Sequence, residues 1–203
     1  MIRKVFHLHQ WVMEKFSWFD FIALLFLRLY LAPVYCMSGI EKINHMSDTV
    51  HWFANDLGLP FPALMAHLAA YTEVVGAVLL FVGFATRWAT IPLMIVMLVA
   101  AATVHFEHGW WALAHQDHES TSRLHNVMLW LKQHYPMRHA YLTELGTPVI
   151  LRNGVEFAAT YFVMLLTLFS FGPGRWLSID YWIKRWFTYH HVEKPANEAI
   201  IRR

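Results

Sequence analysis

Four long apolar runs constrain the fold of this 203-residue chain more than any other feature. They lie at about residues 20–40, 63–84, 88–107 and 154–172. Each run is close to the ~20 residues that a helix needs to cross a hydrocarbon core ~30 Å thick. Four buried helices of a soluble protein would need a larger polar shell, and only 15% of the residues are charged. The runs therefore predict four transmembrane helices.

The segments that flank these runs are predicted to lie along the membrane surface. Apolar residues recur at helical spacing before the first run, at Val5, Leu8, Val12, Phe16 and Phe19. The first run lacks a small-residue cleavage site, which favours an uncleaved anchor over a signal peptide. Aromatic and basic residues mix after Phe171, as they do at membrane interfaces. We predict one all-α domain over residues 1–203, an integral membrane four-helix bundle with amphipathic interfacial helices at both ends.

The distribution of Lys and Arg predicts the orientation of the bundle. These residues gather at the two ends of the chain and at Arg87 in the turn between the second and third runs. The positive-inside rule then places both termini in the cytoplasm. Residues 40–62 and 107–153 are expected to face outward, and most of the fourteen histidines lie in or next to them.

The connection between the third and fourth runs, at about residues 109–152, is predicted to be a helical cap on the outer side of the membrane. Apolar residues follow the i, i+3, i+4, i+7 pattern of an amphipathic helix, at Leu124, Val127, Met128, Leu131 and Tyr135. Ser120 or Thr121 is expected to cap this helix, and Pro136 to end it. We expect the helix to cover the outer mouth of the bundle.

Two histidine pairs, His105 with His108 and His115 with His118, have the i, i+3 spacing of metal ligands. Transient contact with copper would fit such ligands. The alternative is that these histidines are polar residues at an interface rich in Trp and Tyr. Cysteine-based zinc sites and disulfides are excluded because Cys36 is the sole cysteine. The net charge of +2 is too small to indicate a nucleic-acid partner.

Ionisable residues inside the apolar runs are the candidates for a site, because charge in hydrocarbon is costly. Arg28 and Glu73 have similar predicted depths and are expected to form a pair. His105 and Glu156 also match in depth, and Asn153 could join them. The four ionisable residues could form one inner cluster. They could hold the helices together, or they could form a ligand or proton-relay site.

A quinone is one flat apolar ligand that such a site could bind. Arg28, His105 or Tyr71 could donate hydrogen bonds to its carbonyls, and Glu73 or Glu156 could supply protons on reduction. The same site could hold a lipid tail. A channel is disfavoured, because four helices with so few polar faces make a poor pore.

Several motifs occur in an order that resembles the DoxX family of four-helix bacterial inner-membrane proteins. They are RLYLAPVYCMSGIEKI at residues 28–43, Leu57 to Pro60, Glu73 with Gly76, Thr86 with Arg87, His105 with Gly109, Glu156, and Gly172 to Asp180. The resemblance implies redox associations, since members are described as quinone-linked thiosulfate oxidoreductase subunits or as membrane partners of redox-stress enzymes. The long outer connection, with ILRNGVEFAATYF after it and SIDYWI near the end, is most similar to the HvfX branch. That branch is associated with the maturation of modified, copper-binding peptides.

The sequence therefore leads to one main hypothesis and two alternatives. The main hypothesis is a redox- or copper-linked helper in the maturation of a copper-binding peptide, with a quinone or lipid inside the bundle. One alternative is a quinone-dependent oxidoreductase membrane subunit of the thiosulfate type. The other is a non-catalytic anchor for a partner protein, such as a peptide-modifying enzyme or a redox partner. Whether the protein is an enzyme is left open.

Overall fold

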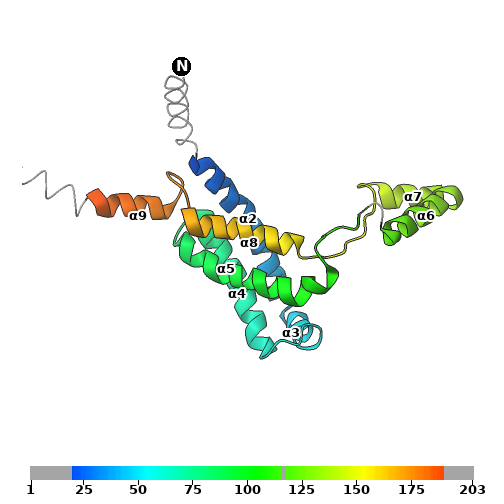
Figure 1. Ribbon diagram of the computed structural model, residues 1–203, viewed down its shortest axis with the longest axis horizontal. Coiled ribbons are helices and arrows are strands. Elements are labelled where there is room, and N and C mark those ends of the chain that lie inside the picture. The colour runs from blue at the N-terminus through cyan, green and yellow to red at the C-terminus, as the bar shows by residue number, and fades with distance from the viewer. Residues whose placement is uncertain (1–19, 116–117, 190–203) are drawn as a thin grey trace, which may run out of the picture. The chain divides into compact units, whose positions relative to one another are not determined.

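The computed structural model describes residues 20–115 and 118–189 of the chain, and these residues are helical apart from turns, loops and one isolated bridge between Leu113 and Leu151. The all-α prediction is thus confirmed for this part of the chain. The elements are α2 (Asp20–Asn44), α3 (Met46–Asn55), α4 (Pro62–Val82), α5 (Thr86–Ala100), a π-helical turn η2 (Ala101–His105), a 3₁₀ turn η3 (Phe106–His108), α6 (Glu119–His134), α7 (Pro136–Thr143), α8 (Glu156–Phe171) and α9 (Ile179–Thr188) (Figure 1).

Three helical segments are long and apolar enough to cross a membrane. They are Phe21–Asn44, Pro62–Val82 and the continuous run Thr86–His108. These segments match three of the four predicted spans. The fourth, α8, is apolar but has 16 residues, which gives a length of ~24 Å, less than the ~30 Å of a hydrocarbon core. A fourth span therefore stays a prediction.

The chain divides into two compact units. In the described residues, the first unit holds residues 20–96 and 161–189, and the second holds residues 97–115 and 118–160. The predicted N-terminal interfacial helix lies outside the described residues. The predicted C-terminal helix is present as α9. Its N-cap is Ser178, and the Ser178 hydroxyl accepts a hydrogen bond from the Tyr181 amide.

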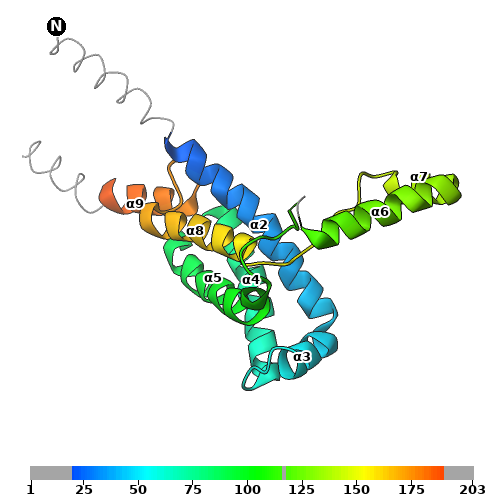
Figure 2. The ribbon, with the colours of Figure 1, turned by 45° about the vertical axis from the view of Figure 1, so that its right-hand side comes forward.

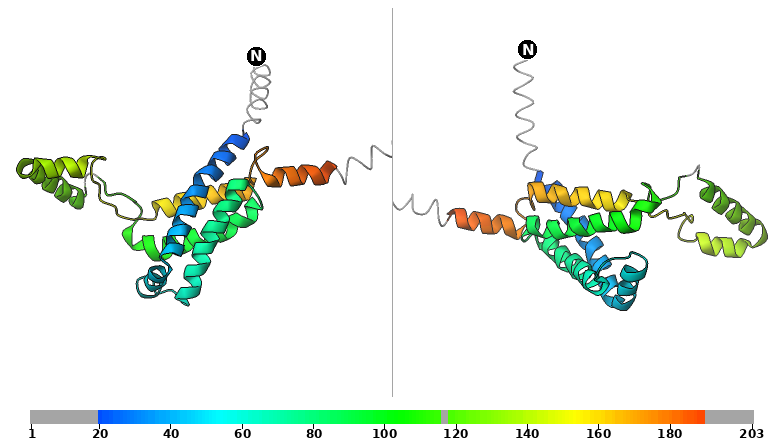
Figure 3. Two further views of the ribbon diagram at one scale, coloured as in Figure 1. Left: turned by 180° about the vertical axis from the view of Figure 1, so that it is seen from behind. Right: turned by 60° about the horizontal axis from the view of Figure 1, so that its bottom comes forward.

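The core of the first unit is the close pairing of α2 with α4, which lie side by side (Figure 3) and are linked by α3 (Figure 2). Gly39 of α2 allows the backbones of α2 and α4 to approach each other closely. A Cβ added at Gly39 would lie 2.7 Å from Val74 Cγ2 and 2.9 Å from the Ala70 carbonyl oxygen. Small buried residues of α4, Ala66, Ala70 and Ala77, continue the same interface.

The turn between α4 and α5 is fixed by the start of α9. The Asp180 carboxylate accepts bonds from the amides of Ala85 (2.7 Å) and Thr86 (3.0 Å) at the N-terminus of α5. The Asp180 amide in turn donates to the Gly83 carbonyl at 3.0 Å. A carboxylate at this position satisfies amides that the helix leaves unpaired and interacts favourably with the helix dipole.

In the second unit, α6 contains the predicted amphipathic helix, but its ends differ from the prediction. The N-cap is His118, whose Nδ1 accepts a bond from the Ser120 amide at 3.3 Å. Histidine takes this place because its ring nitrogen can accept, as the oxygen of Ser or Thr does. Pro136 follows the end of α6, as predicted, and it is also the first residue of a further helix, α7. Proline is favourable in the first turn of a helix. Placement of α6 as a cap stays a prediction.

Candidate functional site

Arg28 is buried in the first unit and binds backbone carbonyls. Its Nε donates to Leu80 O (2.7 Å) and its Nη2 to Phe81 O (2.9 Å), both in the last turn of α4. Its Nη1 donates to the carbonyls of Pro173 (2.9 Å) and Leu177 (3.0 Å). The guanidinium satisfies carbonyls at a helix C-terminus and sits at the negative end of the dipole. Arg28 thereby ties α2 to α4 and to the segment before α9.

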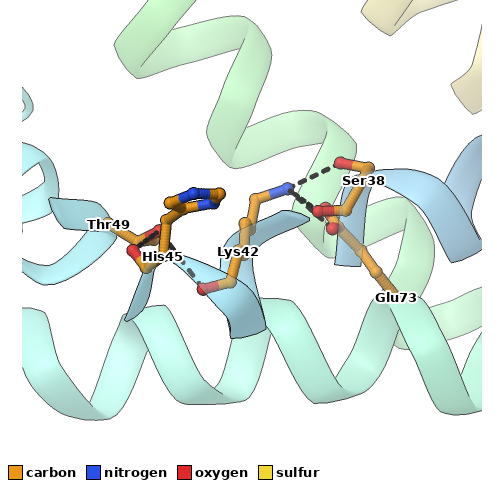
Figure 4. Close-up of polar contacts among 5 residues, drawn as sticks. All are labelled: Ser38, Lys42, His45, Thr49 and Glu73. Carbon is orange, nitrogen blue, oxygen red and sulfur yellow. Dashed lines mark hydrogen bonds and ion pairs between the residues drawn. The ribbon is translucent and has the colours of Figure 1, made fainter. Parts of the chain in front are cut away.

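Glu73 is buried in the middle of α4 and pairs with Lys42 in the last turn of α2. The two charged atoms, Lys42 Nζ and Glu73 Oε2, are 2.7 Å apart, and the side chains are 21% and 3% exposed. Lys42 Nζ also donates to the Ser38 hydroxyl at 2.6 Å and to the Ser38 carbonyl at 3.4 Å (Figure 4). We name Ser38, Lys42 and Glu73 the α2–α4 polar site.

The predicted Arg28–Glu73 pair is wrong, because the register of the two antiparallel helices separates these residues. Arg28 reaches the carbonyls of Leu80 and Phe81, whereas Gly39 packs against Ala70 and Val74. Leu80 lies seven residues beyond Glu73, which is ~10 Å along the helix axis. Lys42, not Arg28, is at the depth of Glu73. Arg28 and Glu73 therefore do not belong to one inner cluster.

Tyr35 lies on the same face of α2 as Ser38 and Lys42. Its side chain is 1% exposed, and its hydroxyl has no hydrogen-bond partner in the described part of the chain. The ring centroid of Tyr35 is 6.5 Å from that of Tyr161 in α8. A buried hydroxyl without a partner costs ~1–3 kcal/mol. This helix face therefore carries a buried hydroxyl, Tyr35 Oη, with a hydrogen-bond donor that is unused within the described residues, in addition to Ser38 and Lys42.

The predicted residues of the second unit each bind backbone atoms. His105 Nδ1 lies 2.7 Å from the Asn153 carbonyl oxygen, so Asn153 does join His105, through its backbone. Glu156 Oε2 accepts a bond from the Ala112 amide at 2.9 Å. These contacts hold the segment after α5 against the segment before α8. The remaining candidate, Tyr71 in the first unit, is 54% exposed, and its ring lies beside that of His67.

The histidine pairs proposed as metal ligands make local contacts. His108 Nδ1 lies 3.1 Å from the Val104 carbonyl oxygen, and the His115 ring packs edge-on against Trp111. His118 caps α6, as described above. Among residues 20–115 and 118–189, no group of three or more His, Cys, Asp or Glu side chains is placed to hold a metal ion.

The sequence predicts that residues 40–62, and so Lys42, lie in an outward-facing connection. The predicted site residues do not include Tyr35, Ser38 or Asp180. A sequence signal for Lys42 exists, because Tyr35, Ser38 and Lys42 recur at i, i+3 and i+7 on one helix face. The extension of α2 to Asn44 brings Lys42 into the helix and onto this face.

Parts of the chain are similar to a known protein family and to several bacterial proteins. The DoxX family model matches residues 23–106. The chain is 30% identical over 97 residues to "Putative oxidoreductase CatD" of Bacillus subtilis, covering 48% of this chain and 70% of the relative. It is also 30% identical over 105 residues to "Inner membrane protein YphA" of Escherichia coli, covering 49% of this chain and 71% of the relative.

A third relative, an uncharacterized protein of Haemophilus influenzae, is 32% identical over 96 residues, with 44% of this chain and 61% of the relative covered. No solved structure matches the chain. The finer resemblance to the HvfX branch stays a prediction. The residues that match the family model include most of α2, all of α4 and the α2–α4 polar site. The match to the family model and the similarity to these relatives show that the chain is a membrane protein of the DoxX family.

Proposed function

We propose that this protein is a membrane-embedded redox component in which the α2–α4 polar site exchanges protons with a quinone. The observation that carries the proposal is the Lys42–Glu73 pair, whose carboxylate is 3% exposed inside an apolar helix. A buried ion pair is weak evidence for a stabilising role, because desolvation offsets the attraction. Ionisable residues within membrane helices more often mark proton relays or ligand sites. The name of the Bacillus relative, a putative oxidoreductase, supports the same class.

The donors of this face fit a quinone. Tyr35 Oη is a buried hydroxyl without an acceptor in the described residues, and a quinone carbonyl is an acceptor. The quinone would supply two-electron chemistry, which requires protons. Glu73 is a carboxyl group, the kind of group that can carry a proton. Lys42 is its ionic partner, and the Ser38 hydroxyl accepts a hydrogen bond from the Lys42 ammonium group. The residues of this face would bind and orient the ring and deliver protons to it.

We further propose a topology for the bundle. α8 serves as a fourth span despite its 16 residues, since the bilayer can thin around a short helix. The protein then lies in the inner membrane, as the name of the Escherichia relative states for that protein. Both termini face the cytoplasm, and the α6–α7 segment faces outward.

The copper-linked peptide-maturation role and the anchor role rest on the resemblance alone. No observation on the described residues favours either of them over the redox role.

Quinone binding tests the proposal directly. The protein is purified in native lipid and its content of extracted quinone is measured, together with the affinity for a short-chain ubiquinone. We expect wild-type protein to hold quinone. Tyr35→Phe should weaken quinone binding about tenfold, because it removes one hydrogen bond that contributes ~1.4 kcal/mol to the binding free energy. Tyr141→Phe, at an exposed tyrosine of α7 outside the proposed site, is the matched control and should leave binding unchanged.

Proton exchange needs its own readout. Glu73→Gln keeps the shape of the side chain but cannot release a proton. With a chemical reductant such as dithionite supplying the electrons, we expect this variant to bind quinone but to reduce it to quinol more slowly, because proton delivery to the ring is slower. The proposal fails if wild-type protein in native lipid binds no quinone, or if the Glu73→Gln variant reduces bound quinone at the wild-type rate.

A further inference from the structure

A cleft in the first unit lies at the end of the helices opposite to the α2–α4 polar site. It has a volume of about 1060 Å³ and is formed by the start of α2, the start of α5, the end of α8 and the length of α9. Asp180, which also lines the cleft, holds α9 to the α4–α5 turn through the amides of Ala85 and Thr86.

Positive charge dominates the cleft. Four cationic side chains line it, namely Arg87, Arg175, Lys184 and Arg185, and all four are exposed. Among the described residues, Asp180 is the one carboxylate that lines the cleft. Both of its oxygens already accept hydrogen bonds from backbone amides. The cleft therefore has an excess of positive charge in its lining, and one of its cations, Arg87, also donates to the Ser170 carbonyl at 3.0 Å.

The remaining walls are apolar and aromatic. Phe21 and Leu24 of α2, Trp88 of α5 and Phe171 of α8 line the cleft beside the cations. Trp88 is 77% and Phe171 is 72% exposed, although large apolar side chains avoid water. This combination fits a molecule with an anionic head and an apolar body.

The position of the cleft favours a lipid over other anionic ligands. α2, α4 and the continuous helical run Thr86–His108 that begins with α5 are long enough to cross a membrane. The cleft is lined by the first residues of α2 and of α5, so it lies at one end of these helices. α9 alternates basic residues with Trp182 and Trp186, and the Arg185 guanidinium lies 5.7 Å from the Trp182 ring centroid. Such helices lie at the level of lipid headgroups.

We propose that this cleft is a binding site for an anionic phospholipid. The lipid phosphate contacts Arg87, Lys184 and Arg185, with Arg175 at the rim, and the first part of an acyl chain packs on Phe21, Trp88 and Phe171. Basic pockets between membrane helices recognise anionic headgroups in this way, and arginine binds phosphate through paired donors. The site is independent of the proposed redox role.

Native mass spectrometry of the full-length protein in detergent tests the proposal. The protein is titrated with phosphatidylglycerol and, separately, with phosphatidylcholine carrying the same acyl chains. We expect tighter binding of phosphatidylglycerol. Each cation near an anionic lipid contributes about a fivefold change in affinity, so Lys184→Gln with Arg185→Gln should weaken phosphatidylglycerol binding about 25-fold. Binding of phosphatidylcholine should not change.

The matched control is Arg123→Gln with Lys132→Gln on α6, which removes the same charge outside the cleft and should bind lipid as wild-type protein does. An additional arm adds inorganic phosphate in large excess, and we expect it to leave phosphatidylglycerol bound.

Equal binding of the two lipids would overturn the proposal, as would unchanged phosphatidylglycerol binding by the cleft variant. Displacement by inorganic phosphate would also overturn it, by showing a site for free anions. If the double variant does not fold, Arg175→Gln decides, with an expected weakening of about fivefold.

Discussion

Two buried charges in the same helix pair are stabilised by different means. The Arg28 guanidinium binds four backbone carbonyls, whereas the Glu73 carboxylate binds one lysine side chain. The carbonyls that Arg28 binds belong to a helix end and a loop, where such groups need partners. Glu73 lies in the middle of a helix, where the backbone is already satisfied and a side chain must supply the counter-charge.

Removing one partner of the Lys42–Glu73 pair should destabilise the protein. We expect Glu73→Leu or Lys42→Met alone to lower the free energy of unfolding by about 3 kcal/mol, because the other charge stays partly buried without its partner. The double variant should lose less than either single variant. Thermal unfolding in detergent measures all four proteins. Additive losses in the double variant would show that the pair is not coupled.

Gly83 is the residue that gives the Arg28 side chain its room. It has a φ of +67°, and a Cβ added there would lie 2.6 Å from Arg28 Nη2 and 2.7 Å from Ser178 Cβ. We expect Gly83→Ala to lower the free energy of unfolding by about 3 kcal/mol, from left-handed backbone strain and overpacking together.

Gly58→Ala separates these two causes. Gly58 has a φ of +59°, and a Cβ there would meet nothing within 4 Å. This variant should therefore lose only the strain of about 1 kcal/mol. Equal losses for the two glycine variants would contradict the role of Gly83 as space for Arg28.

At the scale of elements, Asp180 joins α9 to α5. Its carboxylate accepts the amides of Ala85 and Thr86, so Asp180→Asn leaves a single acceptor oxygen and removes a charge from the helix N-terminus. We expect a loss of about 1–2 kcal/mol in thermal unfolding. Asp48→Asn, an exposed residue in the first turn of α3, is the control for the change in charge and should have little effect. Equal effects would show that net charge, rather than this cap, matters.

The elements themselves could largely be predicted from the sequence, because each depends on a local pattern. Apolar runs of sufficient length indicated the three long helices, and the spacing from Leu124 to Tyr135 indicated α6. The partners of Arg28 and Glu73 could not be predicted in the same way. They depend on the rotation and the register of α2 against α4, which Gly39 and its contacts with Ala70 and Val74 set in three dimensions.

The cleft at α9 could not be predicted from the sequence either, although the residues of α9 that line it have the mixed aromatic and basic composition of a membrane interface. Arg87 is separated from Lys184 and Arg185 by about half of the chain. Tertiary contacts bring them to one place, among them the bonds of Asp180 to the start of α5 and of Arg28 to the segment before α9. The composition of α9 indicated a membrane surface, and the fold adds that its cations face a common space.

At the scale of the whole molecule, the number of spans decides on which side each segment lies. If α8 crosses the membrane, the α6–α7 segment before it and α9 after it are on opposite sides. If α8 stays on one side, both segments are on the same side. The length of α8 does not decide between these arrangements, since ~24 Å is short of the hydrocarbon core but within reach of a thinned bilayer.

Because Cys36 is the sole cysteine, single-cysteine labelling can decide between the two topologies. In a Cys36→Ala background, we expect Ser122→Cys in α6 to react with a membrane-impermeant maleimide on intact cells with a permeabilised outer membrane. Thr188→Cys in α9 should react only after the inner membrane is opened, because the basic residues of α9 keep it inside. Labelling of both positions from the outside would exclude α8 as a span. Labelling of Thr188→Cys alone would reverse the proposed orientation while keeping four spans.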